Sequence, residues 1–145
     1  MGTVASVTFV DQGRDLVKFY VQCDGYIEGF GHELAKWLLR HRIGNGIVLG
    51  ADNYGFCNGV GCLAAQFIAD FKNGPGYLYM DYIDASNKWN DYNYKVMIDY
   101  DDVGTRKLDD VTQIIVTNWE SPKVIFSGTP TELFKYKEPD EEDDQ

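Results

Sequence analysis

The glycine-rich stretch DGYIEGFG, residues 24–31, contains two acids and a tyrosine whose side chains could bind a ligand. This stretch lies where a predicted strand passes into a predicted helix. Backbone amides at a helix N-terminus have no partner within the helix and can hold an anion. One interpretation is therefore a recognition or ligand-binding surface formed by Asp24, Tyr26 and Glu28. The alternative is geometric: the glycines supply the turn and close packing, while a carboxylate of the stretch caps the helix.

A second group combines aromatic and acidic side chains in the C-terminal half of the chain. Tyr79 and Asp81 lie in one predicted strand, Asp99 lies near the end of the next, and Asp101 and Asp102 follow it. Tyrosines that pack in a sheet explain part of this pattern. The remainder is typical of a protein-binding face that fits a basic groove. We expect these five residues to form a contact surface for a partner protein.

Signals for catalysis and metal binding are weak. Cys57 and Cys62 are five residues apart, and His32 and His41 lie on another segment, so no zinc-ligand spacing appears. The serines lack a neighbouring histidine in any recognisable motif. We therefore expect no catalytic residue, no metal and no cofactor, and we predict that the protein is not an enzyme.

The segment from residue 44 to residue 61 holds six glycines, and it contains Asn58, a candidate helix N-cap. Such a loop could hold nucleotide phosphates at the start of the following helix. It lacks the Gly-Lys-Ser/Thr of a P-loop, and residues 44–70 contain no Lys or Arg. We expect a loop or several tight turns, with nucleotide binding as the alternative.

Composition excludes several classes of protein. The 145 residues carry 13 Lys+Arg against 23 Asp+Glu, a net charge of −10, which argues against direct DNA binding. Apolar residues make up 44% of the chain, enough for a hydrophobic core. There is no run of 18 apolar residues and no signal-peptide pattern, so we expect no membrane association and a cytoplasmic location. Three cysteines, an odd number, favour reduced thiols.

Hydrophobic periodicity predicts an α+β fold. Alternation predicts a first hairpin whose turn contains Gly13. Helical spacing predicts a helix from Phe30 to Arg42 or Ile43 and a second one from Val60 to Phe71. The predicted strands are residues 3–10, 16–23, 77–83, 92–100, 111–117 and 123–126. The resulting order, β-β-α-α-β-β-β-β, indicates one mostly antiparallel sheet of five to six strands with both helices on one face.

The chain should form one domain over residues 1–137, followed by an acidic tail. Residues 138–145, EPDEEDDQ, contain six of the 23 acids. Such a charged run is typical of a flexible, solvated end, and it can also dock on a basic partner.

The pattern Asp-Gly-Tyr-x-Glu-Gly-x-Gly after a short hairpin resembles a family of small uncharacterised phage and prophage proteins. A later Leu-Ala-Ala-x-Phe helix with a Gly-Pro-Gly exit extends the resemblance over residues 3–84. Family members usually carry proline where this chain has Ile27. The resemblance implies a phage origin and an accessory role, and it transfers no catalytic residues.

The function we expect is non-catalytic binding of a host protein through an acidic aromatic surface. The target would be an anti-phage defence such as CRISPR, or another host system that handles nucleic acid. Two alternatives remain: a sponge that sequesters a nucleotide signal between the glycine segment and the Asp24–Glu28 turn, and a structural or assembly protein of the virion. The aromatic content is also compatible with a homo-oligomer.

Overall fold

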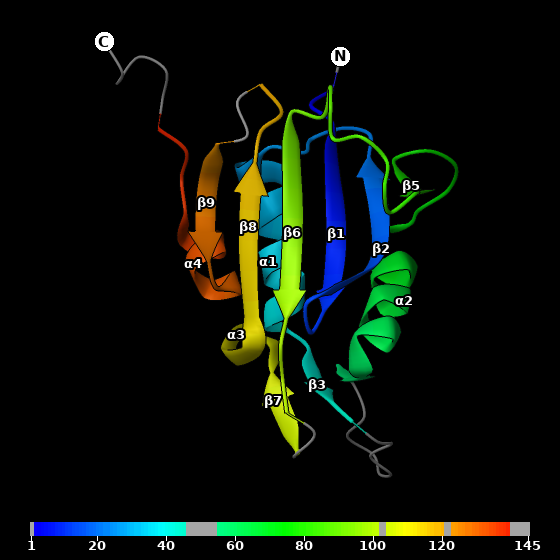
Figure 1. The fold of residues 1–145 in the computed structure, drawn as a ribbon, viewed down its shortest axis with the longest axis vertical. Coiled ribbons are helices and arrows are strands. Elements are labelled where there is room, and N and C mark those ends of the chain that lie inside the picture. Colours follow the sequence, from blue (N-terminus) through cyan, green and yellow to red (C-terminus); the bar gives the residue numbers. More distant parts are fainter. Residues whose placement is uncertain (1, 46–54, 102–103, 121–122, 140–145) are drawn as a thin grey trace.

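A computed structural model describes residues 2–45, 55–101, 104–120 and 123–139. Its main feature is a six-stranded sheet in the order β5-β2-β1-β6-β8-β9 (Figure 1). The strands are β1 (Ala5–Asp11), β2 (Arg14–Val21), β5 (Leu78–Asp81), β6 (Tyr92–Ile98), β8 (Thr112–Thr117) and β9 (Val124–Gly128). Neighbouring strands are antiparallel except β1 and β6. The predicted α+β class and mostly antiparallel sheet are confirmed.

The first hairpin forms as its sequence predicts. Gln12 and Gly13 both have positive φ, 50° and 84°, which is the backbone of a two-residue hairpin turn. The strands pair from Asp11 opposite Arg14 to Ala5 opposite Val21. The tight turn therefore sets the register that turns the apolar side chains of both strands toward the core.

The centre of the sheet is a parallel pair that sequence periodicity does not predict. Val7 of β1 lies opposite Tyr94 of β6, and Phe9 lies opposite Val96. All four side chains are buried. A parallel pair requires a long crossover, and here the chain between the hairpin and β6 supplies it.

The first helix differs from its predicted bounds. It begins with a π-helical turn, η1 (Ile27–Gly31), continues as α1 (His32–Leu39), and ends before Arg42. Arg42 is instead the first residue of β3 (Arg42–Gly44), where its amide donates to the Gly55 carbonyl oxygen at 2.8 Å. The Arg42 amide is therefore used in strand pairing and is not available for a hydrogen bond within a longer helix.

A second, three-stranded sheet corrects the prediction that residues 44–61 form only loop or turns. It has the order β4-β3-β7, with β4 (Phe56–Asn58) and β7 (Thr105–Lys107) on either side of β3. The rest of the glycine segment, residues 46–54, lies outside the described residues. The second predicted helix is confirmed as α2 (Gly59–Phe71). Asn58 occupies its N-cap position, although the Asn58 side chain makes no capping hydrogen bond.

Two short helices were not predicted. They are α3 (Leu108–Val111) and α4 (Pro130–Lys135). The Thr129 side chain accepts from the Glu132 amide at 3.2 Å, and the Glu132 carboxylate accepts from the Thr129 amide at 2.9 Å. This capping box, with proline at the first helical position, fixes where α4 starts. No helix in the described part of the chain is long and apolar enough to cross a membrane.

An aromatic cluster fills the core between the helices and the sheet. At its centre is Phe67 of α2, whose ring lies 4.5–6.3 Å, between centroids, from five other aromatic rings. Those rings belong to Phe9, Phe19, Phe30, Trp37 and Phe71. Since Phe9 and Phe19 come from β1 and β2, Phe67 joins α2 to the middle of the sheet.

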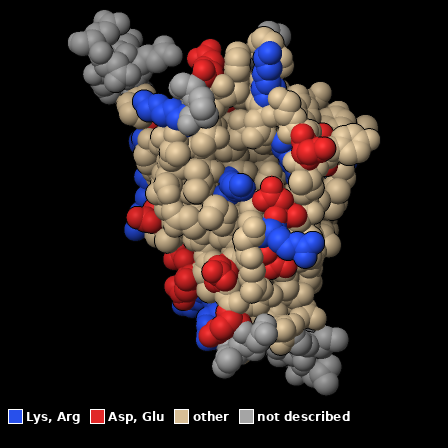
Figure 2. Space-filling view, viewed as in Figure 1, with Lys and Arg blue, Asp and Glu red and all other residues tan. Residues whose placement is uncertain are grey.

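The opposite side of the sheet is polar and carries the loop between β5 and β6. Lys18 of β2 is only 3% exposed, and its ammonium donates to the Ala85 carbonyl oxygen at 2.7 Å and to Asn87 Oδ1 at 2.6 Å. Burial lowers the pKa of Lys18. Figure 2 shows this side as mostly uncharged, with acidic and basic groups interspersed. Lys18 therefore holds the loop that leads to Trp89.

Candidate functional site

The DGYIEGFG stretch is shaped by close packing. Asp24, with φ of 58°, takes the left-handed conformation at this turn. A Cβ at Gly29 would lie 2.6 Å from the Asp24 carbonyl oxygen, and one at Gly31 would lie 2.9 Å from the Tyr94 hydroxyl. These distances leave no room for a larger residue, so the geometric role expected of both glycines is confirmed.

The helix that follows is capped by a distant acid rather than by Asp24 or Glu28. Tyr26 is the N-cap residue of η1 and makes no capping hydrogen bond through its side chain. Instead, the Ile27 amide donates to Glu138 Oε1 at 3.3 Å. The anion held at this helix start is thus a carboxylate of the chain's own C-terminal segment.

Glu138 also binds the hydroxyl of Tyr92, the first residue of β6. The Tyr92 hydroxyl lies 2.9 Å from Oε1 and 2.8 Å from Oε2 of Glu138. Burial, followed by this hydrogen bond and the charge of Glu138, raises the pKa of Tyr92. Glu138 was predicted to begin the flexible tail, and in the structure it contacts the body of the domain. Residues 140–145 lie outside the described residues.

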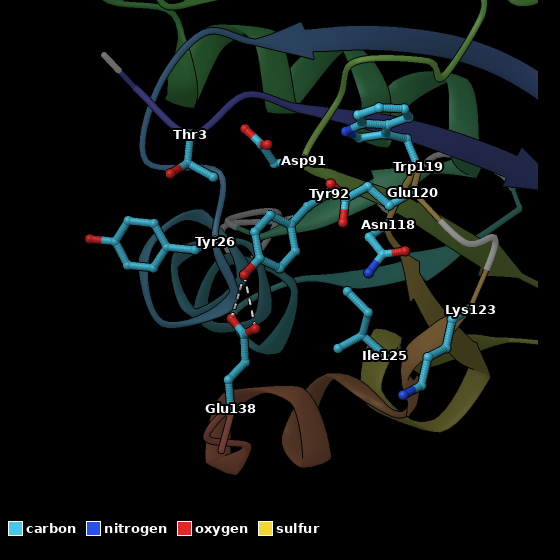
Figure 3. A pocket seen from close by; sticks show the side chains of 10 residues that line it. All are labelled: Thr3, Tyr26, Asp91, Tyr92, Asn118, Trp119, Glu120, Lys123, Ile125 and Glu138. Carbon is cyan, nitrogen blue, oxygen red and sulfur yellow. Dashed lines mark hydrogen bonds between the residues drawn. The ribbon is translucent and has the colours of Figure 1, made fainter. Parts of the chain in front are cut away.

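These contacts form one wall of a cavity of about 580 Å³. Figure 3 shows Tyr92 in the middle of it, with Tyr26 on one side and Trp119, Asn118 and Lys123 on the other. Five segments that are distant in sequence supply its lining: Thr3; Tyr26; Asp91 and Tyr92; the β8–β9 connection with Asn118, Trp119, Glu120 and Lys123, followed by Ile125 of β9; and Glu138.

The charged groups around the cavity are mainly acidic. The charged groups among the described residues of its lining are the carboxylates of Asp91, Glu120 and Glu138 and the ammonium of Lys123. Asp91 is fixed because its Oδ2 accepts from the Val4 amide at 3.0 Å. Three carboxylates against one ammonium favour a cationic ligand.

Two tryptophans extend the cavity toward solvent. Trp119, which lines the cavity, lies 4.8 Å from Trp89 between ring centroids. The Trp89 side chain is 67% exposed, and its φ of 76° is rare for a bulky residue. The Lys88 ammonium lies 5.3 Å from the centre of the Trp89 ring, a cation–π distance. The exposed ring at this rim can therefore attract a cation.

The side chains of the cavity can bind a cationic group. The described residues that line it offer carboxylates, aromatic rings, hydroxyls, an amide and the ammonium of Lys123. Aromatic faces and carboxylates together bind lysine and arginine side chains, through cation–π contacts and charge-assisted hydrogen bonds. The arrangement suits a basic peptide segment.

The predicted acidic binding face is not gathered into one patch. Tyr79 and Asp81 lie on the edge strand β5, whereas Asp99 and Asp101 follow β6, with β2 and β1 between these strands. Asp101 pairs with Arg106 at 3.1 Å. Asp102 lies outside the described residues.

The predicted ligand-binding residues are only partly brought together. Tyr26 lines the cavity. Asp24 and Glu28, each two residues from Tyr26 in the sequence, are exposed and do not line the cavity. Asn58 lies at the start of α2, and the cavity beside that region is lined by other residues, including Arg40 and Cys57. No described cavity is lined by both the Asp24–Glu28 turn and the glycine segment.

Sequence reasoning missed most of the cavity. Trp119, Glu120 and Lys123 lie around the β8–β9 connection, and Glu138 was counted only as part of the tail. The one available signal was the sequence Asn-Trp-Glu directly after a β-branched strand, because a tryptophan in a polar connection is often exposed for binding.

Comparisons with known proteins identify no related protein. No protein-family model matches the chain, and neither the curated proteins nor the solved structures give a match. The resemblance to small phage proteins therefore stays a prediction.

Proposed function

We propose that this protein acts by binding a lysine- or arginine-rich segment of another protein, without catalysis. The observation that carries the proposal is the cavity in which Asp91, Glu120 and Glu138 meet the rings of Tyr26 and Trp119. Aromatic anchors surrounded by polar groups are typical of protein-binding sites.

The partner we propose is a host protein that handles nucleic acid, such as a component of a CRISPR-type defence. Surfaces that hold phosphate backbones are rich in lysine and arginine, so an acidic protein can occupy them. The net charge of −10 supports this choice of partner because it favours approach to such surfaces. The phage origin in this proposal rests on the resemblance of the DGYIEGFG stretch.

Nucleotide sequestration fits the cavity less well. A nucleotide's phosphates would meet three carboxylates and only the ammonium group of Lys123. The repulsion between like charges favours a cationic protein segment over a phosphate-bearing ligand.

The first test replaces Asp91 with asparagine and Glu120 with glutamine in one variant. Asparagine can still accept the hydrogen bond from the Val4 amide, so the fold should be kept. We expect affinity for a host protein captured from bacterial lysate to fall about tenfold or more, with weaker salt dependence, because two charge-assisted contacts are lost. Titration calorimetry with the captured protein at low and high salt measures both effects.

The matched control carries Asp99→Asn and Asp101→Asn, which remove the same charge from exposed positions away from the cavity. This variant should bind about as well as the unmodified protein. An equal loss of affinity in both variants would contradict the proposal, because binding would then depend on the net charge of the protein or on a surface other than the cavity. If the unmodified protein captures no host protein even at low salt, the proposal fails.

The second test replaces Trp89 with alanine. An aromatic anchor at an interface contributes about 2 kcal/mol or more, so we expect roughly a thirtyfold loss of affinity for the same partner. Tyr82→Ala is the control, because Tyr82 is 80% exposed on the same loop. Equal losses in the two variants would show that Trp89 is not an anchor.

A further inference from the structure

The polar side of the large sheet and the loop between β5 and β6 line a separate cavity of about 330 Å³, which we call the polar cavity. Sites for small molecules have volumes of about 300–1,000 Å³, so the polar cavity has the size of a site for a small ligand. The described residues that line it are all different from those of the cavity around Tyr92. It therefore has a chemistry of its own.

The pairing of three strands places polar side chains next to one another in the polar cavity. Thr8 of β1 lies opposite Lys18 of β2 and also opposite Lys95 of β6. Ser6, two residues before Thr8, lies opposite Asn93 of β6. Residues two apart in a strand share one face of the sheet, and all five of these residues line the polar cavity.

Two nearly buried side chains of the polar cavity have hydrogen-bond donors to spare. The ammonium of Lys18, which is 3% exposed, has three N–H groups and uses two of them on the loop. Asn93 is 7% exposed, and its amide oxygen accepts from the Ser6 hydroxyl at 2.6 Å and from Asn90 Nδ2 at 3.1 Å. In the described part of the chain, the Asn93 amide nitrogen has no acceptor. Buried donors of this kind need an acceptor from water or from a ligand.

Carboxylates balance the positive charges of the polar cavity. The charged groups among its described residues are the ammonium groups of Lys18 and Lys95 and the carboxylates of Asp15 and Asp84. Asp15 Oδ1 lies 3.9 Å from the Lys95 ammonium, which is a loose ion pair. Asp84 is exposed in the loop, and its carboxylate accepts no hydrogen bond from a described residue. Balanced charges favour a ligand that carries both signs.

We propose that the polar cavity binds a small zwitterion, a free α-amino acid. The Lys18 ammonium and the Asn93 amide hold the carboxylate of the ligand, and Asp84 and Asp15 hold its ammonium group. The proposal is independent of the binding function proposed above.

A zwitterion fits the polar cavity better than a ligand of one charge. Burial lowers the pKa of Lys18, because the ammonium loses water, and a carboxylate supplies a partner in place of that water. A phosphate group would bring more negative charge close to Asp15 and Asp84. A cation without a carboxylate would leave the spare donors of Lys18 and Asn93 without an acceptor.

The test titrates each of the common amino acids into the ¹⁵N-labelled full-length protein and follows the backbone amide signals by NMR. We expect at least one amino acid to bind with a Kd of about 1 mM or lower and to shift the signals of Thr8, Lys18 and Asn93. The amine that lacks its carboxylate and the carboxylic acid that lacks its amino group should each bind about tenfold more weakly. Each analogue loses a charge-assisted contact.

Two variants separate the two ends of the ligand. Asp84→Asn should weaken binding of the amino acid about tenfold and should not weaken binding of the carboxylic acid. Lys18→Met should weaken binding of both ligands, because it removes a donor to the carboxylate. The matched control is Asp99→Asn, which alters an exposed acid that does not line the polar cavity and should bind as the unmodified protein does.

The proposal is overturned if no amino acid binds at about 1 mM, or if the shifted signals lie away from the polar cavity. Equal affinities for the amino acid and its two analogues would also overturn it. Circular dichroism checks the folding of each variant. If Lys18→Met does not fold, the two analogues and Asp84→Asn, which alters an exposed residue, still decide the question.

Discussion

Replacing Phe67 with alanine should lower the free energy of unfolding by about 3–5 kcal/mol. Phe67 is fully buried, and its ring contacts five other aromatic rings from β1, β2, η1, α1 and α2. Truncation removes the edge-to-face and stacked contacts and leaves a cavity that the surrounding rings cannot fill. Urea unfolding followed by circular dichroism measures the loss.

The matched control is Ile68→Ala, one position further along the same helix. Ile68 is 37% exposed, so its truncation should cost about 1 kcal/mol or less. If both variants lose the same free energy, α2 does not pack through Phe67 as described. A Phe67→Leu variant should recover part of the loss because it refills much of the volume.

Stability should fall steeply in alkali, which is the second large effect. Among the described residues, Cys57, Tyr77, Tyr92 and Tyr94 have pKa values that are raised in the folded protein, in each case chiefly by burial. Each keeps its proton when folded at a pH where the unfolded chain has lost it. The unfolded state then binds fewer protons, so the free energy of unfolding decreases as pH rises.

The directions of these pKa shifts define the pH range over which stability is lost. The stabilisation is fully present below the ordinary pKa values, 9.0 for cysteine and 10.0 for tyrosine. Above them, each such group contributes a loss of about 1.4 kcal/mol per pH unit until its folded pKa is reached. For Cys57 the loss therefore extends from pH 9.0 to about 12.

Tyr92→Phe tests the contribution of the site to this pH dependence. Above pH 10 the free energy of unfolding of this variant should decrease less steeply with pH, because the variant lacks one group whose pKa is raised by folding. It should also be less stable at neutral pH, since Glu138 loses the hydrogen bond from the Tyr92 hydroxyl. Tyr82→Phe, which removes a tyrosine hydroxyl at an exposed position, is the control for stability at neutral pH, and we expect it to cost less than Tyr92→Phe. An unchanged slope in Tyr92→Phe would contradict a raised pKa of Tyr92 in the folded protein.

Local patterns in the sequence predicted the elements that local physics determines. The hairpin follows from alternation around Gly13, and α2 follows from apolar residues at helical spacing from Val60 to Phe71. The parallel pairing of β1 and β6 could not be predicted, because alternation in residues 92–98 reads the same in either strand direction. The three strands of the small sheet are three residues long, too short for any period to show.

The site was less accessible to sequence reasoning than the fold. Tyr26 was identified, but its neighbours in the cavity come from segments up to Glu138, which only tertiary structure brings together. The acidic tail looked like solvated charge because nothing in its composition indicates that its first acid meets the Ile27 amide. By contrast, Thr129, Pro130 and Glu132 do carry a local signal, and α4 could have been predicted from them.

The parallel pair at the centre of the sheet has a consequence for synthesis on the ribosome. β1 emerges early, but its partner β6 begins 87 residues after Ala5, at Tyr92. Until then the edge of β1 that pairs with β6 in the finished sheet has no strand beside it. The closing contacts are long-range, which makes folding slow and leaves the nascent hairpin dependent on chaperones or rapid translation to avoid aggregation.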